Sequence, residues 1–125
     1  MKFFSQRHAI IVGRTDVFGG EKMKITKKAA GNEIIFSVEG RLDSITSLEF
    51  QDMLISALSE CEYVSLDFEN VSYISSAGFR VLLMAQKTAH GRKGSLTILN
   101  VSEQVMKVFD MTGLSPHFSI LPAER

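Results

Sequence analysis

The chain has 125 residues, 45% hydrophobic and 22% charged, which is enough apolar material for one packed domain without a disulfide or a structural metal. Its 14 basic residues balance its 14 acidic ones, so charge gives no reason to expect nucleic acid, an anionic membrane or a polyanionic substrate as a partner. The single cysteine, Cys61, excludes an internal disulfide, and no apolar run approaches the roughly 20 residues of a membrane helix, so the sequence predicts a soluble, cytoplasmic protein.

Residues 1–22 differ in character from the rest of the chain. They carry basic residues and glycines without sustained periodicity, and a second methionine, Met23, follows them. We expect this segment to be an N-terminal extension outside the domain, or the native start to be Met23, and we place the domain at residues 23–125.

The first regular elements are two strands. The short alternating stretch Lys24–Lys27 is typical of an edge strand, and Glu33–Gly40 is rich in β-branched residues and bounded by turn residues. The turn residues between them, within Ala29–Asn32, predict that the two strands pair as an antiparallel hairpin.

A helix is predicted to follow. Thr46 and Glu49 have the spacing of a capping box, and apolar residues then recur at helical spacing. These residues are Phe50, Met53, Leu54, Ala57 and Leu58. They form one apolar stripe, which is the pattern of a helix packed on a sheet.

A second strand–helix unit comes next. Tyr63–Phe68 alternates as a strand, Glu69–Ser75 is predicted to be a loop, and Ala77–Thr88 has the apolar spacing of a helix. The glycines and basic residues of His90–Gly94 end that helix.

The last elements complete an alternating order. Leu96–Leu99 is a strand, Ser102 caps a helix that Gly113 closes, and Phe118–Leu121 is a short final strand. The order β-β-α-β-α-β-α-β predicts an α/β fold, with a mixed, mostly parallel sheet of about five strands and helices packed on it.

The sequence lacks the motifs of common enzyme and cofactor sites. There is no G-x-G-x-x-G after a strand, no P-loop and no nucleophile elbow. The three histidines, His8, His90 and His117, lie far apart without a cysteine or carboxylate at metal-ligand spacing. We therefore expect no catalytic residue, no cofactor and no bound metal.

The segment Leu66–Leu83 stands out, because Ser75-Ser76-Ala77-Gly78 opens an amphipathic helix after a strand and a loop. A serine at that place can cap the helix. The unsatisfied N–H groups and the dipole of a helix N-terminus also favour negative charge, so a phosphate on a first-turn serine is compatible with the fold. The residues alone leave both roles open.

This segment resembles the signature of STAS domains, and in particular of anti-sigma factor antagonists. Val38–Asp43 is similar to the family's Gly-x-Leu-Asp strand end, Ile98–Ser102 to its fourth strand and third-helix start, and Val105–Leu114 to its apolar helix ending in a Thr/Ser-Gly-Leu turn. The resemblance covers about residues 23–121, and its segments agree with the family in order and spacing.

The resemblance implies a phosphorylation switch. Such antagonists bind an anti-sigma factor that is usually also a serine kinase, are released when it phosphorylates them, and are reset by a serine phosphatase. In the family the acceptor lies two residues before the glycine, which gives Ser76 here. Ser75 is the alternative acceptor, and it replaces an acidic residue that the family often has. The implied partner-binding residues are Arg41, Leu42, Asp43, Ser44, Ser75, Ser76, Ala77, Gly78 and Phe79.

Neither nucleic acid nor a membrane is expected as a direct partner, and two other functions stay open. The chain is a candidate for a STAS adaptor without a phosphorylation cycle, such as a subunit of a lipid-transport or signalling assembly. It is also a candidate for a module that binds a small molecule or nucleotide. Labelling from ATP by a kinase separates the switch from the adaptor, and a ligand-induced rise in melting temperature without a partner favours the third function.

Overall fold

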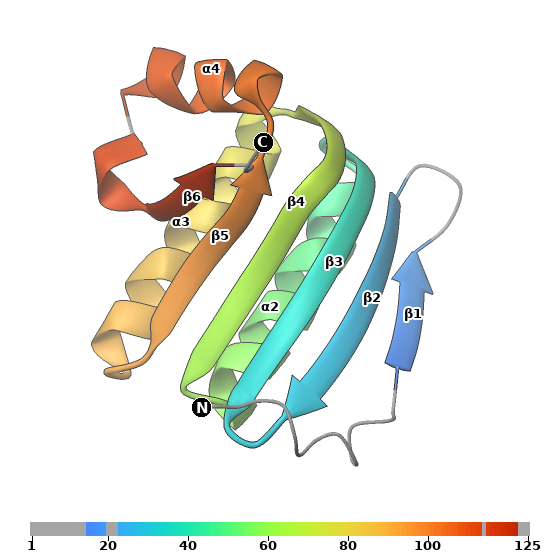
Figure 1. The fold of residues 1–125 in the computed structure, drawn as a ribbon, viewed down its shortest axis with the longest axis vertical. Coiled ribbons are helices and arrows are strands. Elements are labelled where there is room, and N and C mark those ends of the chain that lie inside the picture. Colours follow the sequence, from blue (N-terminus) through green and yellow to red (C-terminus); the bar gives the residue numbers. More distant parts are fainter. Residues whose placement is uncertain (1–14, 20–22, 114, 123–125) are drawn as a thin grey trace.

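The computed structural model describes residues 15–19, 23–113 and 115–122. Its centre is a six-stranded sheet in which β1 to β6 lie in chain order (Figure 1). The strands are β1 (Thr15–Gly19), β2 (Met23–Ala30), β3 (Glu33–Leu42), β4 (Tyr63–Ile74), β5 (Ser95–Val101) and β6 (Ser119–Pro122). The helices are α2 (Thr46–Glu60), α3 (Ser76–Gly91), α4 (Glu103–Thr112) and the short 3-10 helix η1 (Ser115–His117).

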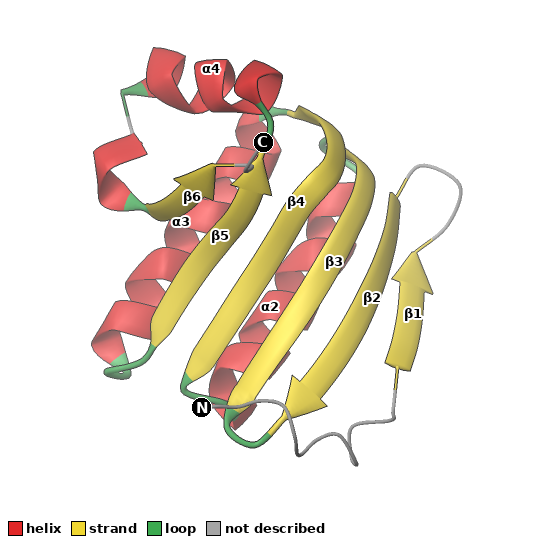
Figure 2. Ribbon diagram, in the orientation of Figure 1, coloured by secondary structure: helices red, strands yellow, loops and turns green. Residues whose placement is uncertain are grey.

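The sheet is mixed. β1, β2 and β3 pair antiparallel, and β3, β4, β5 and β6 pair parallel. Helices α2 and α3 cover one face of the sheet, and α4 lies near the ends of β4 and β5 (Figure 2). The parallel strands β3 and β4 lead directly into α2 and α3. The two helices therefore begin at the same end of the sheet, beside the carboxyl ends of β3 and β4. The predicted fold class and element order are confirmed over Met23–Pro122.

Strand β1 adds a sixth strand to the roughly five that were predicted. It comes from the segment that was expected to lie outside the domain, and it pairs with β2 from Thr15 opposite Lys28 to Gly19 opposite Lys24. The other residues of that segment, 1–14 and 20–22, lie outside the described residues, as does His8. The domain boundary at residue 23 stays a prediction.

Apolar side chains of the sheet and the covering helices form one core. Along β3 burial alternates, with Ile34, Phe36 and Val38 buried, as expected for a strand with one covered face. The predicted apolar stripe of α2 faces this core, with Phe50 and Leu54 fully buried. The hydrophobic periodicity therefore predicts the covered faces correctly.

The predicted loop Glu69–Ser75 is largely wrong, because β4 continues as a strand to Ile74. The pairing of β3 with β4 contains two register shifts, which absorb extra residues of β4. Val71 and Ile74, which lie before and after the second shift, are the buried residues there, three apart in sequence rather than two. The alternation that identifies a strand is lost there although the pairing continues.

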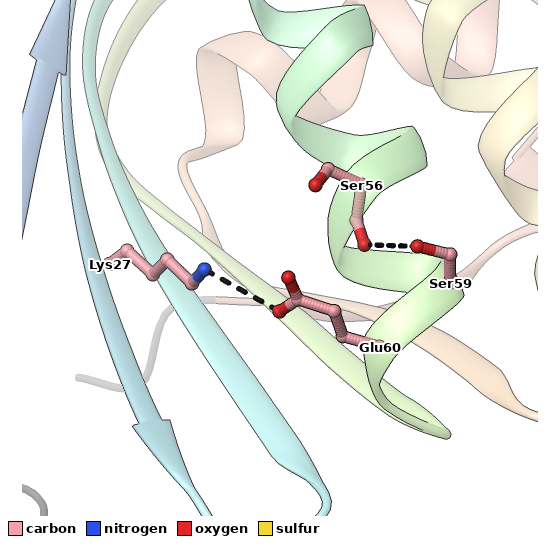
Figure 3. Close-up of polar contacts among 4 residues, drawn as sticks. All are labelled: Lys27, Ser56, Ser59 and Glu60. Atoms are coloured by element: carbon pink, nitrogen blue, oxygen red, sulfur yellow. Dashed lines mark hydrogen bonds and ion pairs between the residues drawn. The ribbon is translucent and has the colours of Figure 1, made fainter.

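Polar contacts lie at the C-terminal end of α2, at the opposite end of the helix from the turn that follows β3. The Lys27 Nζ lies 3.7 Å from the Glu60 Oε1, and the Ser59 hydroxyl donates to the Ser56 carbonyl oxygen at 2.7 Å (Figure 3). The ion pair is partly exposed, so it contributes about 0–1 kcal/mol. Burial, and then the Glu60 carboxylate, raise the pKa of the neighbouring Cys61 thiol, which makes it a poor nucleophile near neutral pH.

Candidate functional site

The candidate site forms where two parallel strands, β3 and β4, end side by side and each leads into a helix. Leu42 at the end of β3 pairs with Ile74 at the end of β4. The Ser75 N–H then donates to the Leu42 carbonyl oxygen at 2.8 Å. The two segments that the sequence singled out, at Asp43 and at Ser75, are therefore neighbours in space.

Asp43 holds the turn from β3 into α2. Its Oδ1 accepts hydrogen bonds from the N–H groups of Ile45 at 3.0 Å and Thr46 at 2.9 Å. The Thr46 hydroxyl accepts from the Asp43 N–H at 2.9 Å and donates to the Arg41 carbonyl oxygen at 2.7 Å. The capping box predicted from Thr46 and Glu49 is therefore wrong: the Thr46 side chain turns back to β3, and the carboxylate at the helix start belongs to Asp43.

Ser75 and Ser76 differ in their surroundings. Ser75 is half-buried, and its Oγ accepts a hydrogen bond from the Gly78 N–H at 3.2 Å, which makes it the N-cap of α3. Ser76 is the first residue of the helix and is exposed, and its hydroxyl bonds to none of the described residues. The first turn of α3 carries no acidic residue, so the positive end of the helix dipole is open at Ser76.

Gly78 lets α3 approach the strand ends closely. A Cβ atom at this position would lie 3.0 Å from the Ile74 Cγ2 and 3.0 Å from the Leu42 carbonyl oxygen. The next residue, Phe79, is buried and packs edge-on against Phe109 of α4, with ring centroids 4.7 Å apart. Leu42, Gly78 and Phe79, all predicted partner residues, are thus buried and hold the site in position.

The other predicted partner residues reach the surface. Arg41, Ser44 and Ser76 are exposed, and Asp43, Ser75 and Ala77 are partly exposed. The Arg41 guanidinium lies over the Tyr73 ring, with 4.3 Å between its carbon and the ring centroid. These side chains surround the ends of β3 and β4 and the start of α3.

A groove that the sequence did not predict lies beside this surface. The groove lies between α2 and α3, has a volume of ≈ 350 Å³, and is lined in part by Ser47, Leu48, Arg80 and Met84. Leu48 is 68% exposed, and Ile45 is equally exposed one turn before it. Both lie off the apolar stripe that α2 turns toward the core. Apolar residues outside the core-facing stripe of a helix are a sequence signal for an exposed apolar surface, and this signal could have identified Ile45 and Leu48.

The site offers an accessible hydroxyl at a helix start, beside apolar side chains, rather than a catalytic constellation. Within the part of the chain that the structure describes, no three His, Cys, Asp or Glu side chains come together as a metal site. Of the described helices, none combines the length and apolarity needed to cross a membrane. An exposed hydroxyl in this position is within reach of another molecule.

Comparison with known proteins gives consistent matches. A sequence model of the STAS domain matches residues 24–125. An anti-sigma-B factor antagonist from Staphylococcus epidermidis is 35% identical over 78 residues, which are 62% of this chain and 72% of that relative.

Solved structures share the fold. An anti-sigma factor antagonist from Mycobacterium paratuberculosis matches with a TM-score of 0.72 at 16% identity, over 80% of this chain and 86% of that one. The Bacillus cell fate determinant SpoIIAA in its phosphorylated form matches with a TM-score of 0.58 at 18% identity, over 86% and 90% of the two chains.

Proposed function

The chain belongs to the STAS domain family, and from this premise we propose that it is an anti-sigma factor antagonist controlled by phosphorylation of Ser76. Unphosphorylated, it binds an anti-sigma factor that is also a serine kinase and so frees a sigma factor. The kinase transfers the γ-phosphoryl group of ATP to the Ser76 Oγ, the hydroxyl proton leaves, and ADP and the modified protein separate from it. The protein regulates transcription without contacting nucleic acid, and it acts in the cytoplasm.

The observation that carries the proposal is the difference between the two adjacent serines. The Ser75 Oγ is occupied by the Gly78 N–H and is half-buried, so modifying it would remove the cap of α3. Ser76 is exposed at the first position of the same helix. A kinase can reach its hydroxyl without unfolding the helix, and the similar fold of Bacillus SpoIIAA, whose structure is of a phosphorylated form, supports a modification of this kind.

A phosphate at Ser76 would act on binding rather than on folding. It adds roughly −1.5 to −2 charges at neutral pH, and at a helix N-terminus the dipole stabilises such charge by about 0.3–1 kcal/mol. The exposed Leu48 lines the same groove as Ala77, the residue after Ser76, and the exposed Ile45 lies one turn before Leu48. In a complex that covers these apolar side chains, the charge would have to be desolvated, and the complex would dissociate.

In this proposal the exposed predicted partner residues contact the anti-sigma factor, and the buried ones position the surface. Arg41 and Ser44 are exposed and would contact the anti-sigma factor, together with the partly exposed Asp43 and Ala77. The buried residues Leu42, Gly78 and Phe79 position this surface. A serine phosphatase would remove the phosphate and restore binding.

The test is mass spectrometry of the protein after incubation with ATP and an anti-sigma factor kinase from its own genome. We expect one phosphate, located on Ser76, in the unaltered chain and in Ser75→Ala, and none in Ser76→Ala. Phosphate on Ser75 in the unaltered chain would overturn the residue assignment. Binding of the kinase without any phosphorylation would instead indicate the adaptor function.

A further inference from the structure

Arg80 lies one helical turn after Ser76 on the same face of α3. Its side chain is exposed. Among residues 15–19, 23–113 and 115–122 no carboxylate forms an ion pair with its guanidinium, and the first turn of α3 carries no acidic residue. The cation is therefore available both to a group on Ser76 and to a partner.

Arg80 also lines the groove between α2 and α3. The Ser47 side chain lines the same groove; the residue is 2% exposed, and its hydroxyl has no hydrogen-bond partner among the residues that the structure describes. An unsatisfied buried hydroxyl costs about 1–3 kcal/mol, and the Ser47 Oγ is itself shielded from solvent beneath the groove. The groove thus combines a cation, Arg80, with the apolar side chains of Leu48 and Met84.

We propose that Arg80 transmits phosphorylation of Ser76 to this groove, an inference that rests on the proposed function. In the unphosphorylated protein, the groove binds an amphipathic segment of the anti-sigma factor. The apolar side chains of that segment contact Leu48 and Met84, and one of its carboxylates pairs with Arg80. Charge complementarity favours an acidic segment, because Arg80 is the charged residue that lines the groove, and the hollow that continues from it along α3 past Arg80 and Met84 is lined by a second cation, Lys87.

Phosphorylation changes the partner of Arg80. Ser76 and Arg80 are four residues apart on one helix, so a phosphate dianion on Ser76 can reach the Arg80 guanidinium. The two groups then form charge-assisted hydrogen bonds, which are stronger than hydrogen bonds between neutral groups. The carboxylate of the anti-sigma factor then loses its counter-ion and faces a negative phosphate. The groove releases its occupant although the fold is unchanged.

Phosphorus NMR of the protein with phosphoserine incorporated at position 76 during translation tests the contact directly and needs no partner. The second pKa of the phosphate is measured in three chains: unaltered, Arg80→Gln and Lys87→Gln. Lys87 is the matched control, because it lies on the same helix face about 10 Å beyond Arg80. Arg41 and Asp43, at the end of β3, are the other charged groups near the helix start and are the same in all three chains.

We expect Arg80→Gln to raise the pKa of the phosphate by about half a unit, because the cation that favours its dianion is gone. Lys87→Gln should leave the titration unchanged. A titration of Arg80→Gln that superimposes on that of the unaltered chain would overturn the proposal. Since the phosphoserine is installed without a kinase, failure here is distinguishable from failure of Ser76 as a kinase substrate.

A binding measurement extends the test to the partner. Arg80→Gln should weaken binding of the unphosphorylated protein to its anti-sigma factor about tenfold and should reduce the further loss caused by phosphoserine 76. An equal loss on phosphorylation with and without Arg80 would also overturn the proposal.

Discussion

Replacement of Gly78 by alanine tests how closely α3 must approach the strand ends. The new Cβ would lie 3.0 Å from the Ile74 Cγ2, 3.0 Å from the Leu42 carbonyl oxygen and 3.2 Å from the Leu42 Cβ. Since one of these atoms is backbone, relief requires a shift of the helix or the strand. Alanine gains about 1 kcal/mol of helix propensity over glycine, and overpacking of a core costs about 1–3 kcal/mol. We expect a net loss of about 1 kcal/mol in the free energy of unfolding.

The matched control is Gly91→Ala at the other end of the same helix. Nothing lies within 4 Å of a Cβ placed there, so this variant should be as stable as the unaltered chain or more stable by up to about 1 kcal/mol. Urea denaturation of both variants gives the comparison, with equal slopes required for a two-state reading. If Gly78→Ala proved as stable as Gly91→Ala, the close contact at the site would not constrain the helix.

Four further predictions concern single side chains. Ser75→Ala should lower the free energy of unfolding by about 1 kcal/mol through loss of the α3 cap, measured in urea; unchanged stability would contradict the cap. Asp43→Ala should cost about 1–2 kcal/mol in the same assay, since the first N–H groups of α2 lose their acceptor, and no loss would show that the turn does not need the carboxylate. Ser47→Ala should leave stability unchanged or raise it by up to about 1 kcal/mol, because an unsatisfied buried hydroxyl is removed; a clear loss would show that the hydroxyl is bonded. Because its pKa is raised, Cys61 should react with a disulfide reagent at about pH 8 more slowly than a free cysteine and should accelerate as the pH rises; equal rates would contradict the raised pKa.

Periodicity predicted the elements whose side chains alternate between a covered and an open surface. It failed in β4, where register shifts separate the buried Val71 and Ile74 by three residues while the pairing with β3 continues. It also did not reveal β1, a strand of only five residues that includes Gly19. In both places the strand is defined by backbone hydrogen bonds to its neighbour. The alternation of apolar and polar residues does not reveal such pairing where the register shifts or the strand is short.

The sequence predicted which segments meet at the candidate site, but not which of the two serines caps α3. The resemblance brought the region of Asp43 together with that of Ser76, and the β3–β4 pairing places these regions side by side. Which serine caps α3 depends on the extended backbone of Ser75, with φ −89° and ψ 174°, and a Ser-Ser pair does not specify that. The groove was missed because Ser47 belongs to α2 and Arg80 to α3, and only their packing reveals it.

The most direct test of the account is the affinity of the protein for its anti-sigma factor, measured by calorimetry with and without phosphoserine at position 76. The account predicts that the unmodified protein binds and that the phosphorylated protein binds at least about tenfold more weakly, a change of about 1.4 kcal/mol, while both forms unfold at similar urea concentrations. Equal affinities of the two forms would contradict the claim that Ser76 is the switch.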